Sequence, residues 1–183
     1  MPKERAAPVS TLSEEPTIKA YGSSRRVAIV GLGNLLLRDE GVGIQVIQRL
    51  EKGALPPRVE LVDGATAGFD LIPLFRDYQG LVVVDALALD DEPGAIYRFT
   101  LEELEAMPQA PFTVHDISFV QAAALARSMG ALPPVIILGI VPELLETGLD
   151  LSARVERRMP ELMRLVLEEA GRLAQALAAG KYA

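Results

Sequence analysis

Residues 26–50 read RVAIVGLGNLLLRDEGVGIQVIQRL, and the order of residue types in this stretch indicates the fold. It begins with a short apolar run, residues 27–30, of the kind that forms a buried parallel strand. Gly31 and Gly33 then interrupt the run as a tight turn. From residue 41 onward apolar residues recur at helical spacing: Val42, Val46, Ile47 and Leu50. The stretch therefore predicts a strand, a glycine turn, an acidic pair and a helix.

A strand, a glycine turn and a helix also open many nucleotide-binding folds. The dinucleotide fingerprint requires glycine at the first, third and sixth positions of the turn, so that the backbone can approach a pyrophosphate. Here Leu36 occupies the sixth position, and the sequence has no GxxxxGK[ST] segment. The turn also leads to Asp39 and Glu40, whose carboxylates would repel a phosphate. A nucleotide-binding enzyme is thus disfavoured, and we expect Asp39 to cap the helix that follows, because a helix N-terminus favours acids.

The composition narrows the class of protein further. The chain has 183 residues, half of them apolar, which is enough for one domain with a full core. Its net charge of -7 argues against nucleic acid as a partner. The absence of cysteine excludes disulfides and thiolate sites and fits a reducing compartment, so we expect a cytoplasmic protein. No apolar window is long enough for a membrane span, which needs about 18 residues or more.

The rest of the chain alternates strands with helices. Residues 1–24 have prolines and charges but no apolar signal segment, so we expect a flexible tail followed by a single domain over 25–183. Further strands are predicted at 58–63, 81–84, 95–99 and 134–141. Further helices are predicted at 69–77, 101–107, 116–129 and 152–179, the last with a kink or break at Pro160. This alternation predicts a three-layer α/β/α sandwich around a twisted, mostly parallel sheet of about five strands.

The strand at 95–99 is expected to differ from the others. It follows its predecessor after a short loop, whereas a parallel crossover needs about a dozen residues or more. We therefore expect this strand to be antiparallel and to lie at an edge of the sheet.

Acidic residues follow four of the predicted strands: Glu40, Asp63, Asp85 and Glu143. In open parallel sheets ligands bind beyond the carboxyl ends of the strands. The helix at 116–129 must begin at that same edge, since a parallel strand follows it, and His115, the only histidine, lies at its start. A histidine nitrogen with carboxylate oxygens suits zinc, nickel, iron or manganese. The sequence therefore predicts a metal site with nitrogen and oxygen ligands at one edge of the sheet.

Each of these residues also has a simpler interpretation. His115 is equally consistent with a surface or capping histidine. Asp63 and Asp85 are of the type that caps a turn after a strand, and Asp116 is of the type that caps a helix. For Glu143 we expect a salt bridge within a loop. No other catalytic set stands out, because the sequence lacks the GxSxG elbow of serine hydrolases.

Taken together, five segments resemble the [NiFe]-hydrogenase maturation endopeptidases: GLGNLLLRDEGVG at 31–43, DGATAG at 63–68, VVVDAL at 82–87, His115, and GIVPE at 139–143. The segments are in the order of the family, and the resemblance extends from residue 26 to about residue 175. It implies an α/β/α endopeptidase of narrow range. Such an enzyme removes a C-terminal extension from the hydrogenase large-subunit precursor once nickel has been inserted, just after the last metal-binding Cys-x-x-Cys segment.

The resemblance also implies roles for particular residues. It implies three metal-binding, catalytic or nickel-sensing residues: Glu40, Asp85 and His115. It implies that the second motif discriminates between substrates, through Asp63, Gly64 and Thr66. Ala65 stands where glycine is common in the family, which leaves the choice of hydrogenase open.

Two roles for the metal are open. In the first, the ion belongs to the protein, polarises the scissile carbonyl and activates water. In the second, which we favour, the three residues sense nickel already held by the precursor, which explains why the precursor must be nickel-loaded. We expect zinc or cadmium to be able to occupy the same ligands, and we expect a monomer. The alternative function is a non-catalytic nickel carrier or chaperone for the same large subunit, which a cleavage product would rule out.

Overall fold

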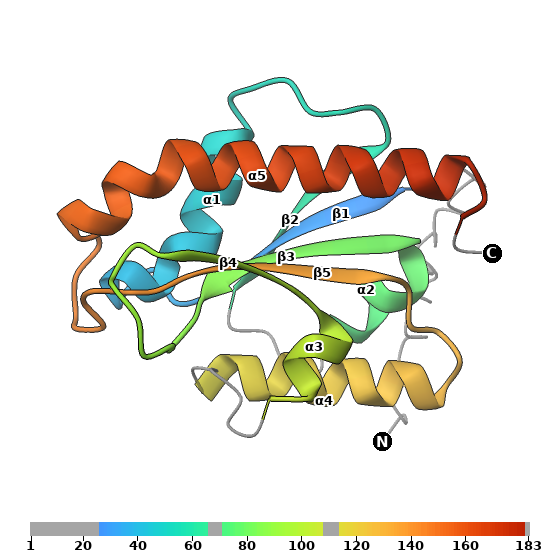
Figure 1. Cartoon of the computed structure of the whole chain (residues 1–183), viewed down its shortest axis with the longest axis horizontal. Coiled ribbons are helices and arrows are strands. Elements are labelled where there is room, and N and C mark those ends of the chain that lie inside the picture. Colours follow the sequence, from blue (N-terminus) through green and yellow to red (C-terminus); the bar gives the residue numbers. More distant parts are fainter. Residues whose placement is uncertain (1–25, 66–70, 108–113, 182–183) are drawn as a thin grey trace, which may run out of the picture.

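A five-stranded sheet runs through the middle of the molecule, and helices cover both of its faces (Figure 1). The computed structural model describes residues 26–65, 71–107 and 114–181, with the side chains of 114–118 outside that description. The predicted three-layer α/β/α sandwich is confirmed. The predicted tail at residues 1–24 lies outside the described residues, so the expected domain division stays a prediction.

The strands follow the order β2-β1-β3-β5-β4 across the sheet. Their bounds are β1 Val27–Leu32, β2 Val59–Ala65, β3 Gly80–Ala86, β4 Ile96–Thr100 and β5 Val135–Ile140. β1 pairs in parallel with β2 and β3, and β3 pairs in parallel with β5. β4 pairs antiparallel with β5 at the edge of the sheet, as its short connection to β3 predicts.

The helices divide between the two faces of the sheet. Their bounds are α1 Val42–Leu50, α2 Ile72–Asp77, α3 Leu101–Glu105, α4 Val114–Ser128 and α5 Ala153–Ala178, with a 3-10 turn, η1, at Arg38–Gly41. α1 and α5 cover one face, and α2, α3 and α4 cover the other (Figure 1). None of the helices in the described part of the chain is long and apolar enough to cross a membrane.

α5 is one continuous helix, so of the kink or break predicted at Pro160 the break is wrong, and the kink stays a prediction. Pro160 lies inside the helix with an exposed side chain. Buried residues on either side of it pack against the sheet and belong to one core: Val155, Met159, Leu162 and Val166. Burial of this apolar stripe holds both halves of α5 against the sheet, although proline removes one helical hydrogen bond.

Alternation along the strands decides which side chains face which helices. In β3, Val82 and Val84 belong to the core beneath α1 and α5, whereas Leu81 and Val83 belong to the core that faces α2 and α4. Successive side chains of a strand point to opposite faces of the sheet. Asp85 therefore projects toward the face that α4 covers.

Candidate functional site

Glu40 lies in η1, beyond the carboxyl end of β1, and only 7% of it is exposed. The glycine turn packs tightly around its main chain. Gly33 has a φ of 122°, and a Cβ built there would lie 1.7 Å from the carbonyl oxygen of Glu40. The N–H of Asn34 donates a hydrogen bond to that same oxygen at 3.2 Å. Gly33 therefore permits the turn to approach η1 closely. In dinucleotide-binding folds the corresponding glycine turn binds a phosphate instead.

Asp85 is the next-to-last residue of β3 and is 2% exposed. Its Oδ1 accepts a hydrogen bond from the N–H of Ala86 at 2.7 Å, so it also has the local contact expected of a residue at a strand end. β3 contacts η1, the segment that carries Glu40. Two buried carboxylates from distant parts of the sequence thus lie at the same edge of the sheet.

His115 is the second residue of α4, which begins at Val114. The helix starts at the edge of the sheet where β1, β3 and β5 end, as predicted (Figure 1). Asp116 is therefore in the first helical turn, and its predicted position as N-cap is wrong. The side chain of His115 lies outside the description. Among the described side chains no three His, Cys, Asp or Glu residues form a metal cluster, and of the predicted trio only Glu40 and Asp85 belong to those side chains.

The second motif lies on β2, the outermost parallel strand. Asp63 falls within β2 opposite Gly31, and its exposed carboxylate accepts a hydrogen bond from the N–H of Ala65 at 2.9 Å. Gly64 is buried, and a Cβ built there would lie 2.6 Å from Leu32 Cδ2. Thr66 lies outside the described residues. The hydrogen bond between Asp63 and Ala65 is the turn contact that is expected of an aspartate before a glycine. Asp63 lies at the same edge of the sheet as Glu40 and Asp85.

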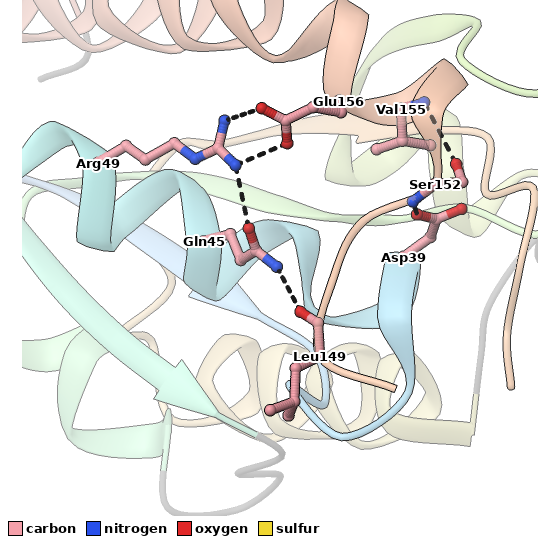
Figure 2. Close-up of polar contacts among 7 residues, drawn as sticks. All are labelled: Asp39, Gln45, Arg49, Leu149, Ser152, Val155 and Glu156. Atoms are coloured by element: carbon pink, nitrogen blue, oxygen red, sulfur yellow. Dashed lines mark hydrogen bonds and ion pairs between the residues drawn. The ribbon is translucent and has the colours of Figure 1, made fainter. Parts of the chain in front are cut away.

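Asp39 does not cap α1, contrary to prediction, because neither η1 nor α1 has a side-chain cap. Its fully buried carboxylate accepts hydrogen bonds from the N–H groups of Glu143 at 2.8 Å, Leu144 at 2.9 Å and Ser152 at 2.7 Å (Figure 2 shows the last). Nothing local in the sequence marks this role, since the partners lie more than a hundred residues away. The neighbour of Glu40 thereby fixes the chain between β5 and α5.

A second set of contacts joins α1 to the start of α5 (Figure 2). Arg49 donates to both carboxylate oxygens of Glu156, at 2.9 and 2.7 Å, and to the side-chain oxygen of Gln45 at 3.2 Å. Gln45 in turn donates to the carbonyl oxygen of Leu149 at 3.1 Å. The hydrogen bonds from Arg49 lower the pKa of Glu156 against a smaller opposing effect of burial. These contacts tie the segment before α5 to the helix that follows the glycine turn.

Glu143, the fourth predicted acid, forms an ion pair with Arg154 at 3.3 Å. This confirms the predicted salt bridge of Glu143, which lies in the loop after β5 and pairs with a residue of α5. A groove of about 500 Å³ lies elsewhere, at the amino ends of β3 and β5, and is lined in part by Phe75, Gln79 and Pro134. It is at the opposite edge of the sheet from Glu40 and Asp85, so it is not part of this site.

Comparison with known proteins gives consistent matches. The sequence pattern of the hydrogenase maturation protease family matches residues 44–169. The Hydrogenase 2 maturation protease of Escherichia coli is 30% identical over 145 residues, which cover 78% of this chain and 88% of that protein. The hydrogenase expression/formation protein HoxM of Azotobacter vinelandii is 32% identical over 175 residues, covering 85% and 84%.

Solved structures agree with these sequence matches. The hydrogenase maturating endopeptidase HybD from E. coli superposes with a TM-score of 0.73 at 29% identity, covering 79% of this chain and 91% of that one. A [NiFe] hydrogenase maturation protease HybD from Thermococcus kodakarensis shares the fold, with a TM-score of 0.68 at 24% identity. The chain therefore belongs to the hydrogenase maturation protease family and is a peptidase.

Proposed function

We propose that this protein is the endopeptidase that removes the C-terminal extension of a [NiFe]-hydrogenase large-subunit precursor after nickel insertion. The observation that supports it most directly is the pair of buried carboxylates, Glu40 and Asp85, at the carboxyl edge of the sheet. α4, which carries His115 in its first turn, begins at the same edge. Ligands of open parallel sheets bind at this edge.

The donor set fits a nickel ion. Carboxylate oxygens and an imidazole nitrogen suit nickel, and also zinc or cadmium. Glu40 and Asp85 are both almost excluded from water, and buried carboxylates in proteins are paired or coordinate metals. In our proposal the nickel arrives as part of the precursor, and Glu40, Asp85 and His115 recognise it. A divalent ion at such a place stabilises negative charge that develops on a carbonyl oxygen.

The second motif is proposed to recognise the part of the precursor that differs between hydrogenases. Asp63 is exposed at the same edge of the sheet, which leaves its carboxylate accessible to a polypeptide. Gly64 and Thr66 are assigned to the same contact. We further propose that the protein is a monomer and that it acts in the cytoplasm, and the absence of cysteine is in keeping with that reducing compartment.

A processing assay read by mass spectrometry tests the proposal. The purified protein is mixed with large-subunit precursor in nickel-loaded and nickel-free forms, beside the variants Glu40→Gln and Asp85→Asn. We expect cleavage of the loaded form only, and loss of cleavage in both variants. Glu143→Gln is the matched control, because this acid lies near the same edge in a surface ion pair, and its variant should cleave normally.

The assay also distinguishes the proposed endopeptidase from the alternative function, a nickel carrier or chaperone. A protein that binds the precursor without producing a shortened chain would be a nickel carrier or chaperone. Cleavage that is independent of nickel, or that survives in Glu40→Gln, would contradict the proposed roles of nickel and of Glu40.

A further inference from the structure

Two segments at the carboxyl edge of the sheet pair with each other and carry exposed leucines. The N–H of Arg38 donates to the carbonyl oxygen of Gly148 at 2.9 Å, and the N–H of Gly148 donates to the carbonyl oxygen of Leu36 at 2.9 Å. We call three leucines on these segments the leucine patch: Leu36, 62% exposed, Leu145, 48%, and Leu149, 66%. The hydrogen bonds join two segments that lie more than a hundred residues apart in sequence.

The backbone beneath the leucine patch is held at several points. Asp39 accepts the N–H groups of Leu144 and Ser152, which lie on either side of the second segment. Gln45 donates to the carbonyl oxygen of Leu149, and the side chain of Leu149 points away from Gln45 (Figure 2). The polar groups of this segment therefore bind inward while its apolar side chain stays outside. Such an arrangement presents the leucine in a fixed position.

The leucine patch adjoins the candidate site directly. The N–H of Glu40 donates to the carbonyl oxygen of Leu37 at 3.1 Å, so Glu40 and Leu36 belong to one compact turn. Two ion pairs lie next to the patch, Arg38 with Glu146 at 3.2 Å and Glu143 with Arg154 at 3.3 Å, whereas Asp150, which follows Leu149, is exposed. The leucines themselves offer a partner apolar surface. Grouped exposed apolar side chains of this kind mark interaction sites, whereas a single exposed leucine does not.

We propose that the leucine patch is a docking surface for apolar side chains of the large-subunit precursor next to its scissile bond. This inference rests on the proposed function, because the precursor is the polypeptide that must reach Glu40 and Asp85. A chain bound at those carboxylates lies beside the patch, and burial of leucine there adds affinity without taking part in the bond cleavage. The patch thus contributes to substrate binding and leaves the chemical step unchanged.

Precursor binding tests this role. Full-length protein with Glu40 intact is titrated by surface plasmon resonance with nickel-free precursor, which we expect it not to cleave. The titration is done with and without Leu149→Ser or the triple change Leu36→Ser, Leu145→Ser, Leu149→Ser. We expect Kd to rise about tenfold for the single change and about a hundredfold for the triple change, as for apolar anchors of an interface. With nickel-loaded precursor, which is cleaved, the same changes should raise KM of processing and leave kcat unaltered.

Met129→Ser is the matched control. Met129 is 65% exposed, close to the value for Leu149, but it follows the C-terminal end of α4, away from the site. Its variant should bind and process the precursor like the wild type. Thermal unfolding of every variant should stay near that of the wild type, since the altered side chains are exposed.

The outcomes distinguish this inference from the proposed function. If the wild type neither binds nor cleaves the precursor, both are contradicted. If the wild type cleaves while the leucine variants keep its Kd and KM, docking alone is contradicted. Light scattering tests whether a second copy of this chain binds the patch instead. The proposal would be overturned if the wild type were a dimer and the leucine changes converted it to a monomer without changing its affinity for the precursor.

Discussion

The carboxylate of Asp39 accepts a hydrogen bond from the main-chain N–H of Ser152 at 2.7 Å, across 113 residues of sequence. Ser152 is the N-cap of α5, and Asp39 immediately precedes Glu40. One buried carboxylate thus joins the turn of the candidate site to the start of the longest helix. It also satisfies the N–H groups of Glu143 and Leu144, which would otherwise need another acceptor.

Asp39→Asn should lower the free energy of unfolding by about 2–4 kcal/mol. The amide keeps one oxygen but turns an NH₂ group toward N–H donors, so at least one buried donor loses its acceptor. Urea unfolding measures the change. Ser152→Ala is the control, because it removes the side-chain cap on Val155 and keeps the main-chain bond to Asp39, and it should cost only about 1 kcal/mol. Equal effects of the two changes would show that Asp39 does no more than an ordinary helix cap.

Gly33→Ala should both destabilise the protein and abolish processing. The new Cβ would lie 1.7 Å from the carbonyl oxygen of Glu40, and the positive φ is strained for alanine, so the turn must move Glu40. Gly130→Ala distinguishes the effect of the steric clash from that of the strained φ. Gly130 also has a positive φ, 68°, but a Cβ built there would have no atom within 4 Å. We expect about 1 kcal/mol of destabilisation and normal processing there, against about 3 kcal/mol or more for Gly33→Ala. Normal cleavage by the Gly33 variant would contradict the argument.

Local signals in the sequence were sufficient to predict most of the fold. The apolar run at 27–30 gave β1, and the short loop before residue 96 gave the antiparallel edge strand β4. Their positions after strands, together with the resemblance to a family, predict Glu40 and Asp85 as site residues, and this role stays a prediction. Both follow from the rule that parallel strands end at one edge of a sheet.

Contacts between residues that lie far apart in the sequence could not be predicted from local signals. Asp39 resembled a helix cap because its neighbours are local, but its partners Glu143, Leu144 and Ser152 come from another part of the chain. The exposure of Leu149 could not be predicted from the sequence either. Hydrophobic periodicity identifies the buried faces of helices and strands, but it does not show which leucine of a loop stays exposed. The break predicted at Pro160 is wrong for the opposite reason, because the local effect of proline on a helix is outweighed by the packing of α5 on the sheet.

His115→Ala should abolish both metal binding and processing. The proposed site has three protein ligands, and loss of the imidazole leaves two carboxylates with no nitrogen donor. Isothermal titration of the free protein with nickel measures the first effect, and the mass-spectrometric assay measures the second. Metal affinity that is unchanged in the variant would remove His115 from the site, even if processing were lost.

Ala65→Gly should raise the free energy of unfolding by about 0.5–1 kcal/mol. Ala65 has a φ of 45°, a left-handed conformation that glycine adopts without the penalty of a Cβ. The N–H of residue 65, which donates to Asp63, is retained in the variant. Thermal or urea unfolding reports the gain. A loss of stability would mean that the greater freedom of glycine in the unfolded chain outweighs the relief of strain.

Glu60 provides a test of stability against pH. It accepts hydrogen bonds from Arg26 and from the hydroxyl of Tyr78, the latter at 2.8 Å, and Arg26 also lies over the Tyr78 ring. Burial alone would raise the pKa of Glu60, but the hydrogen bonds from Arg26 and Tyr78 and the charge of Arg26 outweigh it and lower the pKa below its usual 4.5. A lowered folded-state pKa means that the contact stabilises the protein above pH 4.5 and that this stabilisation is lost as the pH falls through the folded-state pKa.

Glu60→Gln should therefore lower the free energy of unfolding at pH 7 by about 0.5–1 kcal/mol, a small value because the Glu60 side chain is 39% exposed and solvent screens the pair. The difference from the wild type should narrow as the pH falls well below 4.5, where Glu60 is protonated in both folded and unfolded chains. Urea unfolding at a series of pH values gives both curves. Tyr78→Phe keeps the ring beneath Arg26 and removes only the hydroxyl donor, so its effect should be smaller and follow the same pH dependence. A difference between Glu60→Gln and the wild type that stays constant down to pH 3 would assign the loss to packing instead of to the charge of Glu60.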